Sequence, residues 1–444
     1  MKKIFNQLYI SALFFYFMIG IMLLFVISYF FPILYNAIWY LFYLLIIATI
    51  IDIFLLFSTK NKVIANRIMS EKLSNGDENE IYISLQNTFS FLVRIKIIDE
   101  IPFQFQLRNF EVKRKIKAKS KDDYKYILKP TTRGEYFFGN LNIFVSSPIQ
   151  LISRKFIYDA NKMVPTYPSY MQLRKYDLLA FSNNLFQYGL KKIRRIGHTM
   201  EFEQIKEYVQ GDDLRTINWK ATAKKNQLMV NQFQDEKSQN VYMIIDKGRV
   251  MKMPFNGLSL LDYAINATLV LSNIIIKKQD KAGFFAFSKK VENRVVADKK
   301  QSQMQLIMEN LYRIKTDFFE SDFSRLYVDI KININQRSLI LLFTNFETLD
   351  GLNRQLPYLK GIAKNHLVVV VFFKNTETQE LLSKNARNTQ EIYDKVIAEK
   401  FAFEKRLIVN ELRKFGIHSV LTNPEQLTMQ TINKYLEIKS RGIL

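Results

Sequence analysis

Two long apolar stretches near the N-terminus constrain the fold of this chain more than any other feature. Residues 10–31 contain no charged side chain, and residues 37–57 contain a single one, Asp52. A transmembrane α-helix needs about 20 consecutive apolar residues to cross the hydrocarbon core of a bilayer, and each stretch has about that length. The connection between them, with Pro32 and Asn36, is also uncharged. This pattern predicts two transmembrane helices joined as a tight hairpin.

Basic residues flank the predicted hairpin at both of its ends. Lys2 and Lys3 precede the first stretch, and Lys60, Lys62 and Arg67 follow the second. Lys and Arg are enriched in the cytoplasmic flanks of membrane helices, so both ends are expected in the cytoplasm. The sequence thus predicts a two-pass protein of the inner (cytoplasmic) membrane with cytoplasmic soluble domains.

Asp52 is the one carboxylate within the predicted spans. An ionisable residue inside a bilayer often has a function. Asp52 lies close to the cytoplasmic end of its span, however, where it can reach lipid head groups or Lys60. We therefore favour a structural role for Asp52 over a place in an ion or proton pathway.

The composition argues against several kinds of catalytic site. The chain has no cysteine, which removes disulfides, thiolate metal sites and cysteine nucleophiles. Its three histidines lie far apart in sequence, which argues against a zinc hydrolase. Neither a Walker A sequence nor a G-x-S-x-G sequence occurs. We therefore predict that the chain is not an enzyme.

The formal net charge of the chain is +23. A charge of this size is typical of proteins that bind nucleic acid, an anionic membrane surface or an acidic protein. The predicted hairpin favours the membrane surface, so membrane lipid is an expected partner. Nucleic acid is the alternative partner, and the basic residues that would bind it are Lys191, Lys192, Arg194 and Arg195.

Residues 65–165 have the pattern of a small β-sandwich-like domain. Turn sequences separate several strand-like runs, and no convincing helical pattern interrupts them. The runs are residues 80–85, 91–98, 124–128 and 136–145. A series of short strands of this kind predicts an antiparallel sandwich.

A dense basic segment, residues 113–119, lies between two of these runs and reads Lys-Arg-Lys-Ile-Lys-Ala-Lys. One interpretation is contact with anionic lipid head groups, because the hairpin would hold the segment near the bilayer. The other is an exposed edge strand, on which lysines prevent unwanted strand pairing. The sequence leaves both interpretations open.

From about residue 239 the pattern changes to alternating strands and helices. Continuous Val, Ile and Leu runs indicate strands buried on both faces, and hence a mostly parallel sheet between two layers of helices. The strand-like runs are residues 241–245, 282–287, 338–343, 367–373 and 419–421. The helical runs are residues 260–276, 303–312, 352–363 and 389–415, and a last helix follows Pro424. This order predicts a doubly wound α/β domain.

The segment between the two predicted domains is the least generic part of the chain. Residues 201–209 suit a short helix, with Gly211 as its C-terminal stop. Asp212 and Asp213 suit the start of a second helical turn as caps, and Arg215 can pair with either carboxylate. Trp219 is large and apolar, so we expect it to be a buried anchor.

Residues 201–224 resemble the signature of the bacterial family called domain of unknown function 58, whose members are found with MoxR-type AAA+ ATPases. The matching positions are Glu201, Phe202, Tyr208, Gly211, Asp212, Asp213, Arg215, Trp219 and Lys220. Asn218 stands where Asp is usual, and Lys206 where Arg is frequent. The two spans, the Arg-Gly-Glu-Tyr turn at residues 133–136 and the α/β domain extend the resemblance over essentially the whole chain.

The resemblance implies that the C-terminal domain is von Willebrand factor A-like. Such domains bind a divalent cation at the carboxyl ends of their strands, through an Asp-x-Ser-x-Ser loop completed by a later Thr and Asp. Asp246 matches the first position, but Gly248 and Val250 replace the serines, and Thr344-Asn345 stands where the later Asp is expected. Asp246 is thus the remaining candidate ligand of a degenerate site, and no Mg²⁺ or other cofactor is expected. The residues left to bind a partner without metal are Asp246, Arg249, Thr344 and Asn345.

Together these patterns predict a multi-domain membrane protein. It comprises a transmembrane hairpin, a β-rich domain, a connecting segment with the family signature, and a von Willebrand factor A-like domain. The predicted divisions are residues 1–64, 65–165, 166–238 and 239–444. By resemblance, the function is that of an adaptor or co-chaperone for a MoxR-type AAA+ ATPase in complex assembly or maturation. The alternatives are a basic nucleic-acid-binding membrane protein and, least favoured, a metal-dependent hydrolase.

Overall fold

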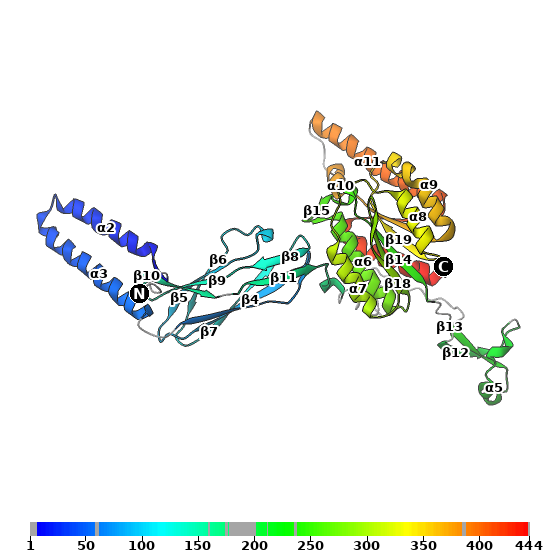
Figure 1. Ribbon diagram of the computed structural model, residues 1–444, viewed down its shortest axis with the longest axis horizontal. Coiled ribbons are helices and arrows are strands. Elements are labelled where there is room, and N and C mark those ends of the chain that lie inside the picture. The colour runs from blue at the N-terminus through cyan, green and yellow to red at the C-terminus, as the bar shows by residue number, and fades with distance from the viewer. Residues whose placement is uncertain are drawn as a thin grey trace. The chain divides into compact units, whose positions relative to one another are not determined.

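The chain divides into two compact units, Met1–Tyr167 and Pro168–Leu444, in this computed structural model (Figure 1). The structure describes residues 7–57, 62–158, 160–173, 176, 201–210, 212–234, 238–383 and 388–442.

Two apolar helices form a hairpin in the first unit (Figure 1). Helix α2 spans Ala12–Ser28, and helix α3 spans Tyr35–Phe57 after a short 3-10 turn, Pro32–Leu34. The run Pro32–Phe57 is long and apolar enough to cross a membrane, and only 17% of its most apolar window is buried in the protein. Leu260–Lys277 passes the same test, but 78% of its window is buried, so it is a core helix of the second unit. The two expected N-terminal helices are therefore present.

Asp52 attaches the hairpin to the β-rich part of the first unit. Its side chain is fully buried, and its Oδ2 accepts hydrogen bonds from the backbone N–H groups of Leu151 and Ile152, both at 2.9 Å. The carbonyl oxygen of Leu151 accepts from the N–H of Ser11 at 3.0 Å, just before α2. These contacts are compatible with the structural role that we favour for Asp52, and its partners are backbone amides distant in sequence. Lys60, the partner considered from the sequence, lies outside the described residues.

In the described part of this unit, three small sheets surround one hydrophobic core. Alternation of buried and exposed residues along β2 and β4 places one face of each strand in the core. In spatial order, one sheet contains β1 (Leu8–Ile10), β10 (Ile152–Tyr158), β9 (Leu141–Ser146), β5 (Val93–Asp99) and β6 (Glu111–Ile116). The second sheet contains β2 (Val63–Ile68), β4 (Asn79–Asn87) and β7 (Lys121–Leu128). The third contains β3 (Leu73–Ser74), β11 (Lys162–Tyr167) and β8 (Gly134–Phe138). The predicted run 136–145 is two strands, because the chain turns at Gly139 and Asn140.

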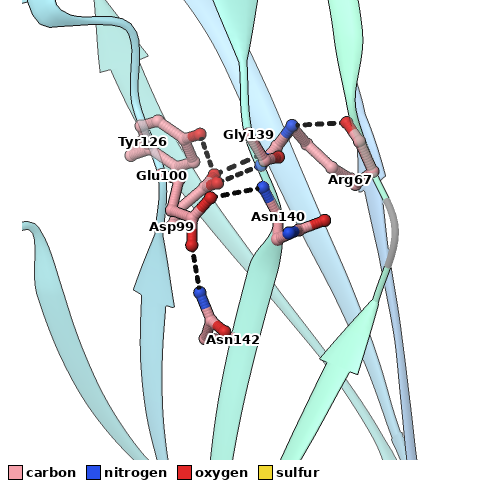
Figure 2. Close-up of polar contacts among 8 residues, drawn as sticks. Arg67, Asp99, Glu100, Tyr126, Gly139, Asn140 and Asn142 are labelled. Atoms are coloured by element: carbon pink, nitrogen blue, oxygen red, sulfur yellow. Dashed lines mark hydrogen bonds and ion pairs between the residues drawn. The ribbon is translucent and has the colours of Figure 1, made fainter.

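A buried ion pair, Arg67 with Asp99, ties these strands together (Figure 2). Arg67 also donates to the carbonyl oxygens of Gly139, at 2.9 Å, and Ala160, at 3.0 Å. Tyr126 donates its hydroxyl to Asp99 at 2.5 Å, and burial next to Asp99 raises the pKa of that tyrosine. Arg67 therefore serves the fold of the β-rich domain and is not a free flanking charge of the hairpin.

The second unit contains a six-stranded sheet between two layers of helices (Figure 1). Five strands are parallel and β18 is antiparallel to its neighbour at one edge. In order they are β18 (Val291–Asp298), β17 (Lys281–Phe287), β14 (Asn240–Asp246), β19 (Leu339–Phe343), β20 (Leu367–Phe373) and β21 (His418–Thr422). This confirms the expected mixed α/β architecture.

Side chains of β14 alternate between the two cores of this sheet. Val241, Met243 and Ile245 belong to one core, whereas Tyr242 and Ile244 belong to the other. The first core includes α6 (Leu260–Lys277), α7 (Ser302–Arg313) and α12 (Leu427–Arg441). The second includes α8 (Phe323–Asn333), α9 (Leu349–Asn365) and α11 (Thr389–Lys414). Strand β18, helix α8 and the short helix α10 (Thr376–Ser383) were not among the predicted elements.

Candidate functional site

Asp246 lies at the carboxyl end of β14, where a parallel sheet most often binds its ligand. It is 1% exposed. Its Oδ1 accepts from the N–H of Gly248 at 2.8 Å and from the hydroxyl of Ser321, and its Oδ2 accepts from the hydroxyl of Thr344 at 2.7 Å. Burial raises the pKa of Asp246 above its ordinary value. Both carboxylate oxygens of Asp246 therefore accept hydrogen bonds from hydroxyl or backbone N–H groups of the protein.

Ser321 fills the space that a side chain at position 248 would need. A Cβ atom built on Gly248 would lie 2.2 Å from the Ser321 hydroxyl oxygen and 3.0 Å from the Phe319 carbonyl oxygen. Because Gly248 has no side chain, the Ser321 hydroxyl, from the loop before α8, can occupy this space. Position 248 is where the first serine of the metal-binding loop was expected. These residues do not fit a Mg²⁺ site, because Asp246 is the one carboxylate among them and both of its oxygens already accept hydrogen bonds from the protein.

A cavity of about 480 Å³ lies beside this sheet edge. Phe373, Phe401 and Leu421 contribute apolar walls, and Lys374 and Arg406 contribute positive charge. Lys405 lies in the same wall, and its Nζ donates to the Asn345 Oδ1 at 2.8 Å and to the Phe346 carbonyl oxygen. Desolvation lowers the pKa of Lys405 to about 8. An apolar group that carries an anion would match this lining.

The four residues predicted to bind a partner do not form one surface. Asp246 and Thr344 contact each other and are both buried, and Asn345 is turned toward Lys405. Arg249 is exposed in a short 3-10 turn, Arg249–Met251. Partner binding by these residues stays a prediction.

Two residues of this region were not identified from the sequence. Lys405 follows the buried register of α11, together with Ala398, Ile408 and Leu412, so a lysine in the apolar face was a usable signal. Ser321 had no such signal, because it lies in a loop far from Asp246 in sequence.

The signature segment forms a β-hairpin, so the helix predicted over residues 201–209 is wrong. Strand β12 (Glu201–Glu207) pairs antiparallel with β13 (Met229–Gln234). Phe202 and Ile205 have a spacing that also suits a helix, but β13 supplies hydrogen-bond partners from a part of the chain more than 20 residues away. For Glu201 and Phe202 only the backbone is described, and Gly211 lies outside the described residues.

Polar side chains organise the turn between these strands. Asp213 caps the 3-10 helix Leu214–Thr216 by accepting from the N–H of Arg215 at 3.0 Å. Asp212 accepts from Lys206 at 2.9 Å and from the N–H of Val209 at 3.0 Å. The expected capping by Asp213 is confirmed, whereas the partner found for Asp212 is Lys206.

Asn218 caps the helix α5 (Trp219–Lys225) that follows. Its side-chain oxygen accepts from the N–H of Ala221 at 3.0 Å, and its Nδ2 donates to the Asn231 Oδ1 at 2.8 Å. Asn and Asp are about equally good N-caps, so the departure from the usual Asp preserves the helix start.

Trp219 is 71% exposed, so the expectation of a buried anchor is wrong. Leu214 and Val209, from the same turn region, are 67% and 63% exposed. Tyr208 uses its backbone N–H to bond the carbonyl oxygen of Leu228 at 2.8 Å, and Lys220 is exposed. The signature residues thus build a small hairpin that presents large apolar side chains to solvent. The basic residues Lys191, Lys192, Arg194 and Arg195 lie outside the described residues.

Comparison with known proteins places the signature hairpin and most of the α/β unit in one matched region. Residues 204–387 match the family model described as "Protein of unknown function DUF58". A curated relative, the uncharacterized protein YeaD of Bacillus subtilis (strain 168), is 22% identical over 129 residues, or 28% of this chain. The matched region spans 30% of that relative's length.

Solved structures show weaker similarity. A conserved hypothetical protein BatB from Bacteroides thetaiotaomicron is 14% identical, with a TM-score of 0.32, and the alignment covers 46% of this chain and 100% of that one. The PapD-like domain 7 of human CEP192 is 12% identical, with a TM-score of 0.19 over 24% of this chain and 84% of that one. The CARDB domain of PF1109 from Pyrococcus furiosus is 9% identical, with a TM-score of 0.18 over 24% of this chain and 88% of that one.

Proposed function

We propose that this chain, whose residues 204–387 match the family of unknown function DUF58, is a membrane-anchored interaction protein that binds its partner through the signature hairpin formed by β12 and β13. The exposure of Trp219, Leu214 and Val209 on a built hairpin carries this proposal. Large apolar side chains that are exposed together in one region mark interaction sites, and Trp is enriched among the residues that dominate binding energy.

The apolar hairpin α2–α3 supports the anchor. Most of its large side chains are exposed, and α3, at 23 residues, has a length of about 35 Å, enough for a ~30 Å hydrocarbon core. The lysines at positions 2, 3, 60 and 62 support a cytoplasmic location for the β-rich domain and for the second unit. The anchor would hold the interaction surfaces at the cytoplasmic face of the inner membrane of a bacterium.

The proposed partner is a MoxR-type AAA+ ATPase, for which this chain acts as adaptor or co-chaperone in complex assembly or maturation. This choice rests on the family resemblance and on a von Willebrand factor A-like assignment of the α/β unit. The cavity beside Lys405 provides a second contact for an acidic, apolar segment of that partner, since Lys374, Lys405 and Arg406 outnumber Glu347 around it.

Affinity capture with the full-length chain in detergent tests the proposal. Wild type should retain a MoxR-type ATPase in the presence of ATP, ADP or a non-hydrolysable ATP analogue, and Trp219→Ala should retain at least tenfold less, as expected for a hot-spot tryptophan. Tyr393→Ala is the matched control, because Tyr393 is 64% exposed on α11, outside the signature hairpin of β12 and β13. Recovery of no ATPase by wild type in any nucleotide state would refute the partner. Equal recovery by wild type and Trp219→Ala would refute the binding surface.

A further inference from the structure

A large basic groove lies on the first unit beside the start of α2. Its volume is about 1210 Å³. Its lining includes Tyr9, Ile10, Ser11 and Ala12, which lead into α2, and residues of strand β6 at the other edge of the same sheet. The groove thus joins the basic segment 113–119, whose role the sequence left open, to the beginning of an apolar helix.

The strand register places four basic side chains on one face of the sheet. Lys96 of β5 lies opposite Lys113 of β6, and Arg94 lies opposite Lys115. Like charges directly opposite each other on neighbouring strands are destabilising. Glu111 bridges Lys96 at 2.6 Å and Lys113 at 3.3 Å, which offsets only part of this excess. An anion held between the strands would remove the remaining repulsion.

Protection of a sheet edge does not account for all of these charges. Strand β6 is the edge of its sheet, so Lys113 and Lys115 can prevent strand pairing there. Strand β5 lies between β9 and β6 and has no free edge. Edge protection therefore does not explain Arg94, which donates to the Gln150 Oε1, or Lys96, which pairs with Glu111.

The aromatic residues of this face suit a membrane–water boundary. Tyr9 packs edge-on against Phe144, with ring centroids 5.2 Å apart, and the Nζ of Lys155 lies 5.9 Å from the Tyr9 ring centroid. Tyr9 lies three residues before α2 begins at Ala12. Tyr and Lys with this placement are typical of the head-group level of membrane proteins.

We infer that this groove binds the phosphodiester head group of an anionic phospholipid in the leaflet where α2 begins and α3 ends. The inference rests on the proposed membrane anchor. The head-group phosphate contacts Lys113 and Lys115 from the edge strand and Arg94 and Lys96 from the inner strand, and the acyl chains extend along the apolar surface of α2. Recognition is electrostatic, so a zwitterionic lipid binds more weakly.

Native mass spectrometry of the full-length chain in a neutral detergent tests the inference. Phosphatidylglycerol or phosphatidylcholine is titrated in, and the lipid-bound fraction gives an apparent Kd for each. We expect phosphatidylglycerol to bind more tightly to wild type, and Lys113→Gln with Lys115→Gln to weaken its binding on the order of tenfold. Arg94→Gln with Lys96→Gln should give the same loss without changing the edge strand.

Lys289→Gln with Lys290→Gln is the matched control, because both lysines are exposed on the second unit and the charge change is the same. Unchanged phosphatidylglycerol binding in both groove variants would overturn the assignment, as would an equal loss in this control. Alkaline extraction of bacterial membranes separates this inference from the proposed anchor. Release of wild type by alkali removes the anchor, whereas retention together with unchanged lipid binding removes the groove alone.

Discussion

Replacement of Asp52 by leucine is expected to loosen the attachment of the hairpin to the β-rich domain. The Asp52 Oδ2 accepts the N–H groups of Leu151 and Ile152, each at 2.9 Å and both buried. A hydrogen bond to a charged group contributes ~1.5–3 kcal/mol, and an unpaired buried N–H costs ~1–3 kcal/mol. Leucine also removes the buried Asp52 Oδ1, which has no hydrogen-bond partner among the described residues, and this offsets part of the loss. The net decrease in the free energy of local opening is therefore about 2–4 kcal/mol.

Hydrogen–deuterium exchange of the full-length chain in detergent measures this opening directly. A decrease of 2–4 kcal/mol corresponds to roughly 30- to 700-fold faster exchange at the amides of Leu151 and Ile152, because ~1.4 kcal/mol is a factor of ten. Ile50→Leu is the control, since Ile50 is 59% exposed on the same helix and should leave exchange unchanged. Unaltered protection of these amides in Asp52→Leu would refute the argument that Asp52 attaches the hairpin.

Three further outcomes follow from buried groups. Asp99→Ala leaves Arg67 buried without its carboxylate, so the free energy of unfolding measured by urea denaturation should fall by about 3–5 kcal/mol; a wild-type midpoint would contradict this. Burial lowers the pKa of Lys405 to about 8, so wild type should gain stability relative to Lys405→Met as the pH rises from 8 to 10.5. A difference in Tm between the two proteins that stays constant over this pH range would contradict the lowered pKa. The pKa of Asp246 is raised from 3.8, so wild type should lose stability relative to Asp246→Asn as the pH rises above that value. Parallel pH–Tm curves would contradict it.

Local patterns were sufficient to predict most elements of the α/β unit and both apolar helices. The continuous apolar run of β20 predicts a strand buried on both faces, and the apolar spacing of α6 predicts a helix. The hydropathy of α6, however, does not distinguish it from a membrane span. Its burial among strands of the same unit decides that it is a core helix.

The candidate sites were harder to predict, because their residues meet across long sequence separations. Ser321 reaches Asp246 from 75 residues away and fills the space above Gly248, which no local pattern indicates. Strand β12 is a strand because β13 pairs with it, although its own spacing also suits a helix. Trp219 was expected to be buried because of its size, but its position after the Asn218 cap leaves it in solvent.

The sequence by itself determined which segments are apolar, with what period, and where charge is concentrated, because these properties are local to each residue. Only the tertiary structure decided which residues pack against each apolar segment and which groups pair with each charge. It gave Asp52 two amide donors in place of a lipid or a lysine, and it placed Arg94 and Lys96 beside the basic edge strand. Hydrogen bonds and charge pairs depend on distances across the fold, and those distances exist only once the strands have paired.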